Sequence, residues 1–421
     1  MKTLLMIESW CFASGMLLPR KIQEMGHRFL LVTRDPEFYR KYAPSGGEHP
    51  VLELADEIVV CDTNSLSDLL RACEDVRSRR PVDGVITSCD YYIEAAAEAA
   101  SALSLPSNPV ESVSRSVNKY FMRRTHASKG VPSPRFALAL SPDDSEAIAA
   151  VTGLPAIVKP ADMNGSALVR KVETVEAMKE AVSSVLSLRE NTRGRERFRG
   201  ALVEEFLRGE EFSAECCVVG GEVHILGVTD KQLGGKSGVV ETGHMFPARM
   251  AQDEERSVRE CVASALEAVG YVHGVAHVEV RATPEGPRII EINPRIGGNY
   301  ISELVERTIG VSPLSQMIQL ALGEEPELVG KERERPKSAA VAFVLPGQTG
   351  ILSGWSGEHE MATSPGVVRY VLSPEGSRAT GSDDNDCYLG YVVAEDMEGP
   401  NAAQAASSAL SKLEPIIKPE M

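Results

Sequence analysis

Long apolar runs and paired cysteines are missing from the sequence, and positive charge is scarce. No run approaches the roughly 20 apolar residues of a membrane-spanning helix. The short apolar run at the N-terminus is interrupted by Glu8 before it could form the core of a signal peptide. We therefore expect a cytoplasmic protein with no membrane partner.

The eight cysteines form no C-x-x-C pair and no metal-binding spacing with histidine. We expect reduced, mostly buried thiols, with Cys216 and Cys217 facing opposite sides of one strand. A net charge of -16 argues against a nucleic-acid surface, although a local basic pocket could still bind phosphates. No G-x-S-x-G motif or Cys/His signature points to a nucleophilic side chain.

What is present is an ordinary globular composition, with 421 residues, enough for two or three domains. Short apolar strands alternate with helical segments over the first hundred residues, beginning with strands at 3–7 and 27–33. This spacing predicts a parallel sheet with helices on its faces. The first strand–helix loop lacks G-x-G-x-x-G, so we do not predict a dinucleotide site there.

The middle of the chain predicts a basic helix from about Arg115 to Ser128 and then, over 154–169, a strand, a loop and a strand. Lys159 ends the first of these strands, and small residues follow it. That arrangement can place a point charge and backbone N–H groups around phosphates, whereas a surface lysine in a hairpin is the alternative. From Lys337 onward, short strands lie between Gly, Pro and Ser clusters, and a last helix follows.

The stretch from Tyr271 to Asn299 predicts two strands joined by a turn at residues 283–287. Because strand side chains alternate between faces, each strand has one apolar face, formed by Ala276, Val278 and Val280 in the first and by Ile290 and Ile292 in the second. The opposite face carries His277, Glu279, Arg281, Glu291, Asn293 and Arg295. Oxygen ligands on a rigid hairpin suit Mg²⁺, while a solvated charged face is the alternative interpretation.

The sequence IIEINPRIGGN resembles the closing motif of the ATP-grasp superfamily, in particular the carboxylate–amine ligases that couple L-amino acids. The resemblance implies that Glu279, Glu291 and Asn293 hold two Mg²⁺ ions, for which Mn²⁺ could substitute. Arg295 and Lys159 would be the catalytic residues, with Arg295 contacting the reacting phosphate or carboxylate.

The resemblance also implies a site for ATP. Two lysines and a loop would contact the phosphates, a hinge would read adenine, and a carboxylate would accept hydrogen bonds from the ribose. These residues are Lys119, Lys159, Ser166, Glu204, Glu205, Phe206, Leu207 and Glu211. The loop departs from the family because only Gly165 remains, with Met163 and Leu168 where glycines are common. This departure concerns the conformation of the loop more than the role of Lys159.

For the substrates, the resemblance points to Lys231, His244, His277, Arg295 and Gly298. It also points to the loops around Ser9, Arg34 and Ser88–Asp90 of the N-terminal domain, which would help to enclose the substrate. It implies α/β and α+β architecture, with a Rossmann-like domain at 1–112 and an ATP-grasp core at 113–334. The core would have a small lobe at about 130–207 and a large lobe at about 208–334, and a mostly antiparallel C-terminal domain would span 335–421. A homodimer is expected, since dimers are common among the resembling proteins.

The resemblance therefore implies an enzyme that phosphorylates a carboxylate with ATP and lets an amine displace the phosphate, forming an amide between amino acids or similar metabolites. Two alternatives stay open. One is an ATP-grasp carboxylase that uses bicarbonate on a nucleotide-like substrate. The other is an ATP-binding relative without catalysis, which the glycine-poor loop favours.

Overall fold

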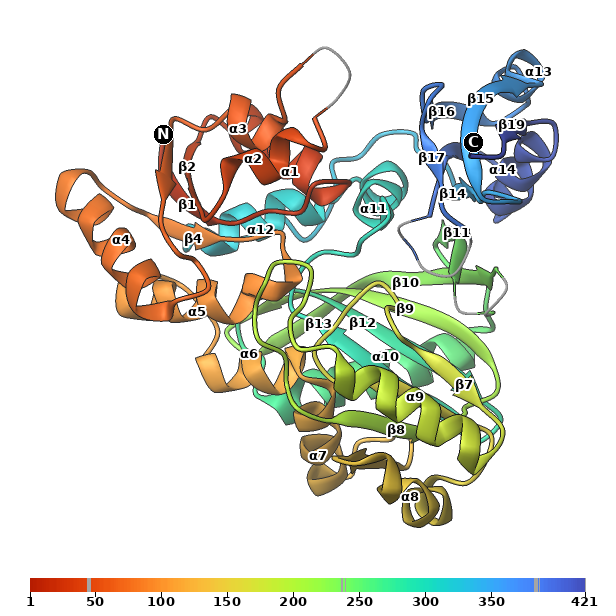
Figure 1. Ribbon diagram of the computed structural model, residues 1–421. Coiled ribbons are helices and arrows are strands. Elements are labelled where there is room, and N and C mark those ends of the chain that lie inside the picture. Colours follow the sequence, from red (N-terminus) through yellow and green to blue (C-terminus); the bar gives the residue numbers. More distant parts are fainter. Residues whose placement is uncertain (44–46, 236–237, 239, 382–384, 386, 421) are drawn as a thin grey trace.

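In the computed structural model, residues 1–43, 47–235, 238, 240–381, 385 and 387–420 are described, and within them the strands form four sheets (Figure 1). The predicted combination of a parallel N-terminal sheet with antiparallel sheets further along the chain is confirmed. No helix in these ranges has the length and apolar character needed to cross a membrane.

The N-terminal sheet is parallel, with the strand order β3-β2-β1-β4. Its core strands are continuous apolar runs because helices cover both faces; Leu4 and Phe29 pack on one side and Leu5 and Leu30 on the other. The strands are β1 (Thr3–Ile7), β2 (Arg28–Thr33), β3 (Glu57–Val60) and β4 (Gly84–Ile86). The helices are α1 (Ser14–Glu24), α2 (Pro36–Arg40), α3 (Pro50–Glu53), α4 (Leu66–Arg79), the 3-10 turn η1 (Asp90–Tyr92) and α5 (Ile93–Ala102).

The single helix predicted from Arg115 to Ser128 is wrong, because two helices, α6 (Val110–Val117) and α7 (Lys119–Lys129), meet at Asn118. Asn118 has an extended backbone, and its side chain accepts hydrogen bonds from the backbone N–H groups of Tyr120 and Phe121. An asparagine that caps the second helix in this way interrupts the first. Lys119 consequently becomes the first residue of α7.

A small antiparallel sheet follows, with the order β5-β8-β6-β7. Its strands are β5 (Phe136–Ala139), β6 (Ala156–Pro160), β7 (Arg170–Val172) and β8 (Ala201–Glu205). The 3-10 turn η2 (Pro142–Asp144) and the helices α8 (Ser145–Thr152) and α9 (Val175–Ser187) accompany it, and side chains from α8 and α9 share its apolar core. Lys159 lies near the end of β6, as predicted.

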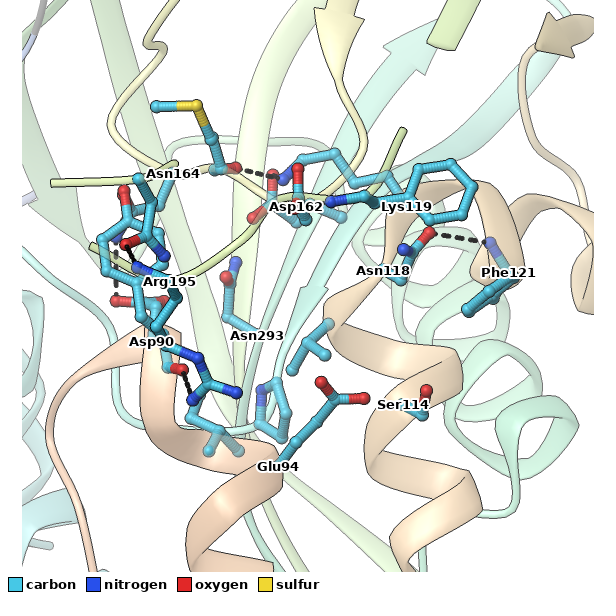
Figure 2. A pocket seen from close by; sticks show the side chains of 18 of the residues that line it. Asp90, Glu94, Ser114, Asn118, Lys119, Phe121, Asp162, Asn164, Arg195 and Asn293 are labelled. Carbon is cyan, nitrogen blue, oxygen red and sulfur yellow. Dashed lines mark hydrogen bonds and ion pairs between the residues drawn. The ribbon is translucent and has the colours of Figure 1, made fainter. Parts of the chain in front are cut away.

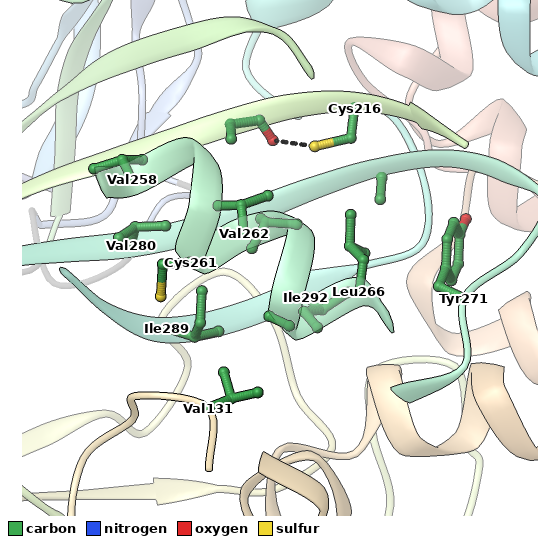
Figure 3. Close-up of a cluster of buried hydrophobic side chains, with 14 of the residues drawn as sticks. Val131, Cys216, Val258, Cys261, Val262, Leu266, Tyr271, Val280, Ile289 and Ile292 are labelled. Carbon is green, nitrogen blue, oxygen red and sulfur yellow. Dashed lines mark hydrogen bonds between the residues drawn. The ribbon is translucent and has the colours of Figure 1, made fainter. Parts of the chain in front are cut away.

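The large antiparallel sheet has the order β13-β12-β9-β10-β11-β14-β18-β16. Helix α10 (Gln252–Val269) covers one face, where Val258, Val262 and Leu266 share a buried cluster with Val280 and Ile292 (Figure 3). The strands are β9 (Glu210–Val219), β10 (Glu222–Gly234), β11 (Val240–Phe246), β12 (Gly274–Thr283), β13 (Gly286–Asn293), β14 (Ser338–Val344), β16 (Val367–Leu372) and β18 (Gly390–Asp396).

Three strands of the C-terminal region extend this large sheet, because β14 pairs with β11. The remaining strands, β15 (Gly350–Ser356), β17 (Arg378–Ala379) and β19 (Glu414–Lys418), form a separate antiparallel sheet. The other helices are α11 (Ile301–Ile309), α12 (Pro313–Ala321), α13 (Glu358–Ala362) and α14 (Ala402–Leu410). Helix α12 returns to the N-terminal sheet, where Leu314 and Ile318 join its core.

The predicted hairpin is β12–β13, but one face of its second strand was assigned incorrectly. Glu279 pairs with Glu291 and Val280 pairs with Ile289, so Ile290 is an extra residue in a β-bulge. Ile289 therefore enters the core in place of the predicted Ile290. The bulge leaves Glu291 and Asn293 on the polar face, opposite Glu279 and His277.

Candidate active site

The face of the large sheet turned away from α10 carries polar rows that run across the strands. Directly paired residues share a face, and one row is Arg281, Glu211, Lys231 and His244, on β12, β9, β10 and β11. The next row along the strands contains Glu279 and Ser213, and the one after contains His277 and Glu215. Glu291 and Asn293 pair with Glu279 and His277, so the register brings the predicted metal ligands onto one surface with Lys231, His244 and His277. Arg295 and Gly298 follow the end of the hairpin.

Lys231 is the centre of the first row. Its buried ammonium lies 2.6 Å from a carboxylate oxygen of Glu279, 3.0 Å from one of Glu241 and 3.2 Å from one of Glu211. Burial lowers the pKa of Lys231, but the three carboxylates outweigh it and raise that pKa well above its ordinary value. Burial alone would raise the pKa values of Glu241 and Glu279. The positive charge of Lys231 outweighs this effect, so both pKa values are lowered.

Glu211, predicted to contact ribose, forms ion pairs with both Lys231 and Arg281. Its side chain is 10% exposed, so it belongs to the charge network of the sheet. The ribose contact stays a prediction.

Glu241 is a member of this cluster that the sequence did not reveal. It lies 3.1 Å from Nε2 of buried His244 and accepts a hydrogen bond from the side-chain amide of Asn299. Residues three apart on a regular strand face opposite ways, but Thr242 is skipped in the pairing of β10 with β11. This bulge turns Glu241 and His244 to the same side.

The candidate metal ligands, Glu279, Glu291 and Asn293, come from paired positions of the hairpin. Asn293 is buried, and Glu291 lies 3.1 Å from the ammonium of Lys119. In the part of the chain that the structure describes, no three His, Cys, Asp or Glu side chains group as a metal site. Two carboxylates and an amide instead fit an Mg²⁺ ion whose remaining ligands are phosphates and water.

On the small sheet, Glu204 lies between two cations. Its oxygens are 2.6 Å from Nε of Arg123 and 2.7 Å from Nζ of Lys159, and all three side chains are buried. Burial would raise the pKa of Glu204, but Arg123 and Lys159 hold it at about 2. Burial also lowers the pKa of Lys159, and Glu204 only partly offsets this. Arg123 donates a further hydrogen bond to the carbonyl of Ile290 in the bulge, which ties the small sheet to the hairpin.

The hinge residues follow at the end of β8. The carboxylate of Glu205 accepts hydrogen bonds from the backbone N–H and Nε of Arg135. The ammonium of Lys171 lies 4.7 Å above the Phe206 ring, and Leu207 comes next in the chain. Their contacts with adenine stay predictions.

In the loop after Lys159, Gly165, Ser166 and Leu168 all have positive φ angles, between 57° and 62°. Leu168 therefore adopts the left-handed conformation that glycine adopts freely. Ser166 and Leu168, which carry side chains, thus share the left-handed backbone of this loop with Gly165.

Arg295 connects the hairpin to the N-terminal sheet. Its Nε donates a 2.6 Å hydrogen bond to Asp90, which follows β4. The second oxygen of Asp90 accepts hydrogen bonds from Nε1 of Trp10 and from the amide of Asn164. Open space lies beside Gly298, where an added Cβ would meet no atom within 4 Å. The loop around Ser88–Asp90, predicted to contribute to the site, thus reaches Arg295.

Comparison with known proteins matches the ATP-grasp domain family to residues 152–303 and L-amino acid ligase C-terminal domain 2 to residues 342–418. The chain thus contains an ATP-grasp domain followed by a C-terminal domain of the kind found in L-amino acid ligases. The match to the ATP-grasp domain covers the hairpin, the small sheet except β5, and the loop after Lys159.

This ATP-grasp protein is 28% identical over 363 residues to an uncharacterized protein of Sinorhizobium fredii, covering 82% of the chain and 73% of that relative. It is 30% identical over 176 residues to carnosine synthase 1 of Mus musculus, covering 41% of the chain but only 21% of the synthase. A solved structure of an L-amino acid ligase from Bacillus licheniformis has the same fold, with a TM-score of 0.82, 20% identity and 99% of each chain covered.

Proposed function

We propose that this ATP-grasp protein forms an amide bond between amino acids or amino-acid-like metabolites, releasing ADP and phosphate. The observation that carries the proposal is the convergence of Glu279, Glu291, Lys119 and Lys231 around one hairpin, with Arg295 at its end. Two carboxylates and several cations at one place suit the binding of a metal and a polyphosphate beside a substrate carboxylate.

For ATP, the proposal gives Lys119 and Lys159 the task of neutralising the phosphates. The loop containing Ser166 would cover them, and Glu204 would hold Lys159 in place through their 2.7 Å ion pair. Residues Glu205–Leu207 and Glu211 stay the candidates for adenine and ribose. Glu279, Glu291 and Asn293 would hold Mg²⁺, which neutralises charge on the phosphates when bound.

At the substrate end, Arg295 would orient the carboxylate as one of its oxygens attacks the γ-phosphorus and ADP leaves. The amine nitrogen would then attack the acyl carbon, lose a proton, and displace phosphate. Such a reaction depends on positioning and charge neutralisation rather than on a nucleophilic side chain. Lys231, Glu241, His244 and His277 on the polar face of the sheet, together with Gly298 after the hairpin, would hold the substrates.

The test is release of ADP and phosphate from Mg-ATP across a matrix of amino acids and small carboxylates, with products identified by mass. We expect turnover only with particular pairs, and a product lighter than their sum by one water. Turnover that requires bicarbonate and no amine would identify a carboxylase instead. ATP binding without turnover on every pair would support a relative without catalysis.

A matched pair of variants tests the site itself. Glu291→Gln removes a proposed metal ligand and should reduce ATP turnover at least a hundredfold, because the phosphate charge loses its counter-ion. Glu285→Gln alters an exposed carboxylate in the turn of the same hairpin and should leave turnover unchanged. Unchanged turnover in Glu291→Gln would contradict the assignment of the metal site.

A further inference from the structure

A cavity of about 260 Å³ lies beside Lys119, on the side of the N-terminal sheet. Its walls come from η1 and α5, the junction of α6 and α7, the loop between β6 and β7, the loop between α9 and β8, and the end of β13 (Figure 2). Glu291 and Asn293 of the hairpin reach it, so the cavity adjoins the proposed metal ligands. Its apolar lining includes Ile93, Val117, Phe121, Met163 and Phe198.

Most charged side chains that line this cavity are already neutralised by a neighbour. Asp90 pairs with Arg295, Asp162 with Arg197, Glu196 with Arg199, and Glu291 with Lys119. These residues therefore offer a ligand little net charge unless their pairs break.

Two lining residues differ from the others. Within the described ranges, Glu94 of α5 has no hydrogen-bond or ion-pair partner for its carboxylate, and Arg195 has no carboxylate partner. Arg195 donates one hydrogen bond to the backbone carbonyl of Tyr91, and its guanidinium lies 5.1 Å from the centre of the Tyr92 ring. Both side chains are half-buried, and Figure 2 shows them approaching the same space from different elements. One small cavity thus presents an uncompensated negative group and an uncompensated positive group.

We propose that this cavity binds a zwitterionic α-amino acid, with its carboxylate on Arg195 and its amino group toward Glu94. A guanidinium with spare donors binds a carboxylate in a defined orientation. The volume is below the usual 300–1,000 Å³ of sites for drug-sized ligands, which suits one amino acid and not a nucleotide. The apolar lining would accommodate an aliphatic or aromatic side chain.

This inference rests on the proposed function and gives the amine substrate its place. The amine substrate of an amide-forming reaction keeps its own carboxylate, which needs a cation other than Arg295. Arg195 supplies that cation on a separate loop. An amino acid held there would lie beside Glu291 and Asn293, where the acylphosphate is expected.

The experiment measures binding without ATP, so that it does not depend on turnover. Saturation-transfer NMR titrations would use the full chain and a panel of the twenty proteinogenic L-amino acids. For each amino acid that binds, its carboxamide and its N-acetyl derivative would be titrated beside it. We expect at least one apolar amino acid to bind, and each derivative to bind at least tenfold more weakly, since each lacks one charge.

The variants assign each preference to one residue. Arg195→Gln should make the amino acid and its carboxamide bind equally, Arg195→Lys should restore part of the preference, and Glu94→Gln should reduce the preference for the free amine. Glu98→Gln on the same helix and Arg189→Gln on the same loop lie outside the cavity lining and should change neither preference. A melting temperature for every variant shows that it is folded.

Absence of binding by every amino acid in the panel would overturn the proposal, as would preferences that persist unchanged in Arg195→Gln and Glu94→Gln. Either result, found beside ATP turnover with an amino-acid pair, would leave the ligase function standing and refute only this cavity as the amine site. Binding with the expected preferences, together with no ATP turnover on any pair, would support the cavity as an amino-acid site and refute the ligase function.

Discussion

Asp90 and Arg295 are 205 positions apart in the chain, yet the carboxylate of Asp90 accepts a hydrogen bond from Nε of Arg295 at 2.6 Å. Both side chains are largely buried, at 12% and 13% exposure. Burial lowers the pKa of Arg295, but Asp90 outweighs it and raises that pKa. One carboxylate of the N-terminal sheet therefore sets the orientation of the arginine proposed to meet the substrate.

Asp90→Asn tests this relationship. The amide keeps the shape but loses the charge, so the ion pair and the short hydrogen bond weaken, and we expect the free energy of unfolding to fall by about 1–3 kcal/mol. Urea unfolding at neutral pH measures it. Asp75→Asn is the control, because the ion pair of Asp75 with Arg79 is exposed and such pairs contribute about 0–1 kcal/mol. Equal losses in the two variants would show that the Asp90–Arg295 pair contributes no more than a surface contact.

Local sequence patterns predicted much of the fold and little of this contact. Continuous apolar runs predicted the parallel strands, and alternation predicted the hairpin and its polar face. Two β-bulges changed details that alternation could not foresee, because each adds one residue to a period of two. One moved Ile289 into the core instead of Ile290, and the other turned Glu241 toward Lys231. Asp90 and Arg295 meet only through the tertiary arrangement, which no local pattern encodes.

His126 gives a prediction about acid stability. It is fully buried in α7, and burial, assisted by the nearby charge of Arg123, lowers its pKa from 6.5 to about 4. Between pH 6.5 and 4 the unfolded chain takes up a proton that the folded protein does not, so stability falls as the pH falls through this window. His126→Leu should remove that part of the decline, as measured by urea unfolding at several pH values. His224→Leu changes a partly exposed histidine and should leave the decline in place.

The loop after Lys159 gives a prediction about backbone conformation. Gly165 has a φ of 62°, and an added Cβ would meet no atom within 4 Å. Gly165→Ala therefore costs only the left-handed conformation, about 1–2 kcal/mol. If the loop covers the phosphates, ATP should bind about 5–30-fold more weakly, as calorimetry can measure. Gly347→Ala, at a glycine with open space and no positive φ, is the control. Unchanged ATP affinity in Gly165→Ala would show that this loop does not cover the phosphates of the bound nucleotide.

The adjacent residues Glu204 and Glu205 allow a matched test of the phosphate lysine. Glu204 lies between Arg123 and Lys159, whereas Glu205 pairs with the largely exposed Arg135. Burial already lowers the pKa of Lys159, and Glu204 is the group that opposes this. In Glu204→Gln the pKa of Lys159 should fall further, so the lysine loses charge as the pH rises. We expect ATP to bind at least tenfold more weakly at pH 8 than in the unaltered protein, with part of the affinity returning at pH 6 as Lys159 is protonated again. In Glu205→Gln, whose carboxylate pairs with Arg135 and not with Lys159, ATP binding should keep the pH dependence of the unaltered protein. If ATP affinity is weakened equally at pH 8 and pH 6, it does not depend on the charge of Lys159. Glu204 would then act only as a structural anchor.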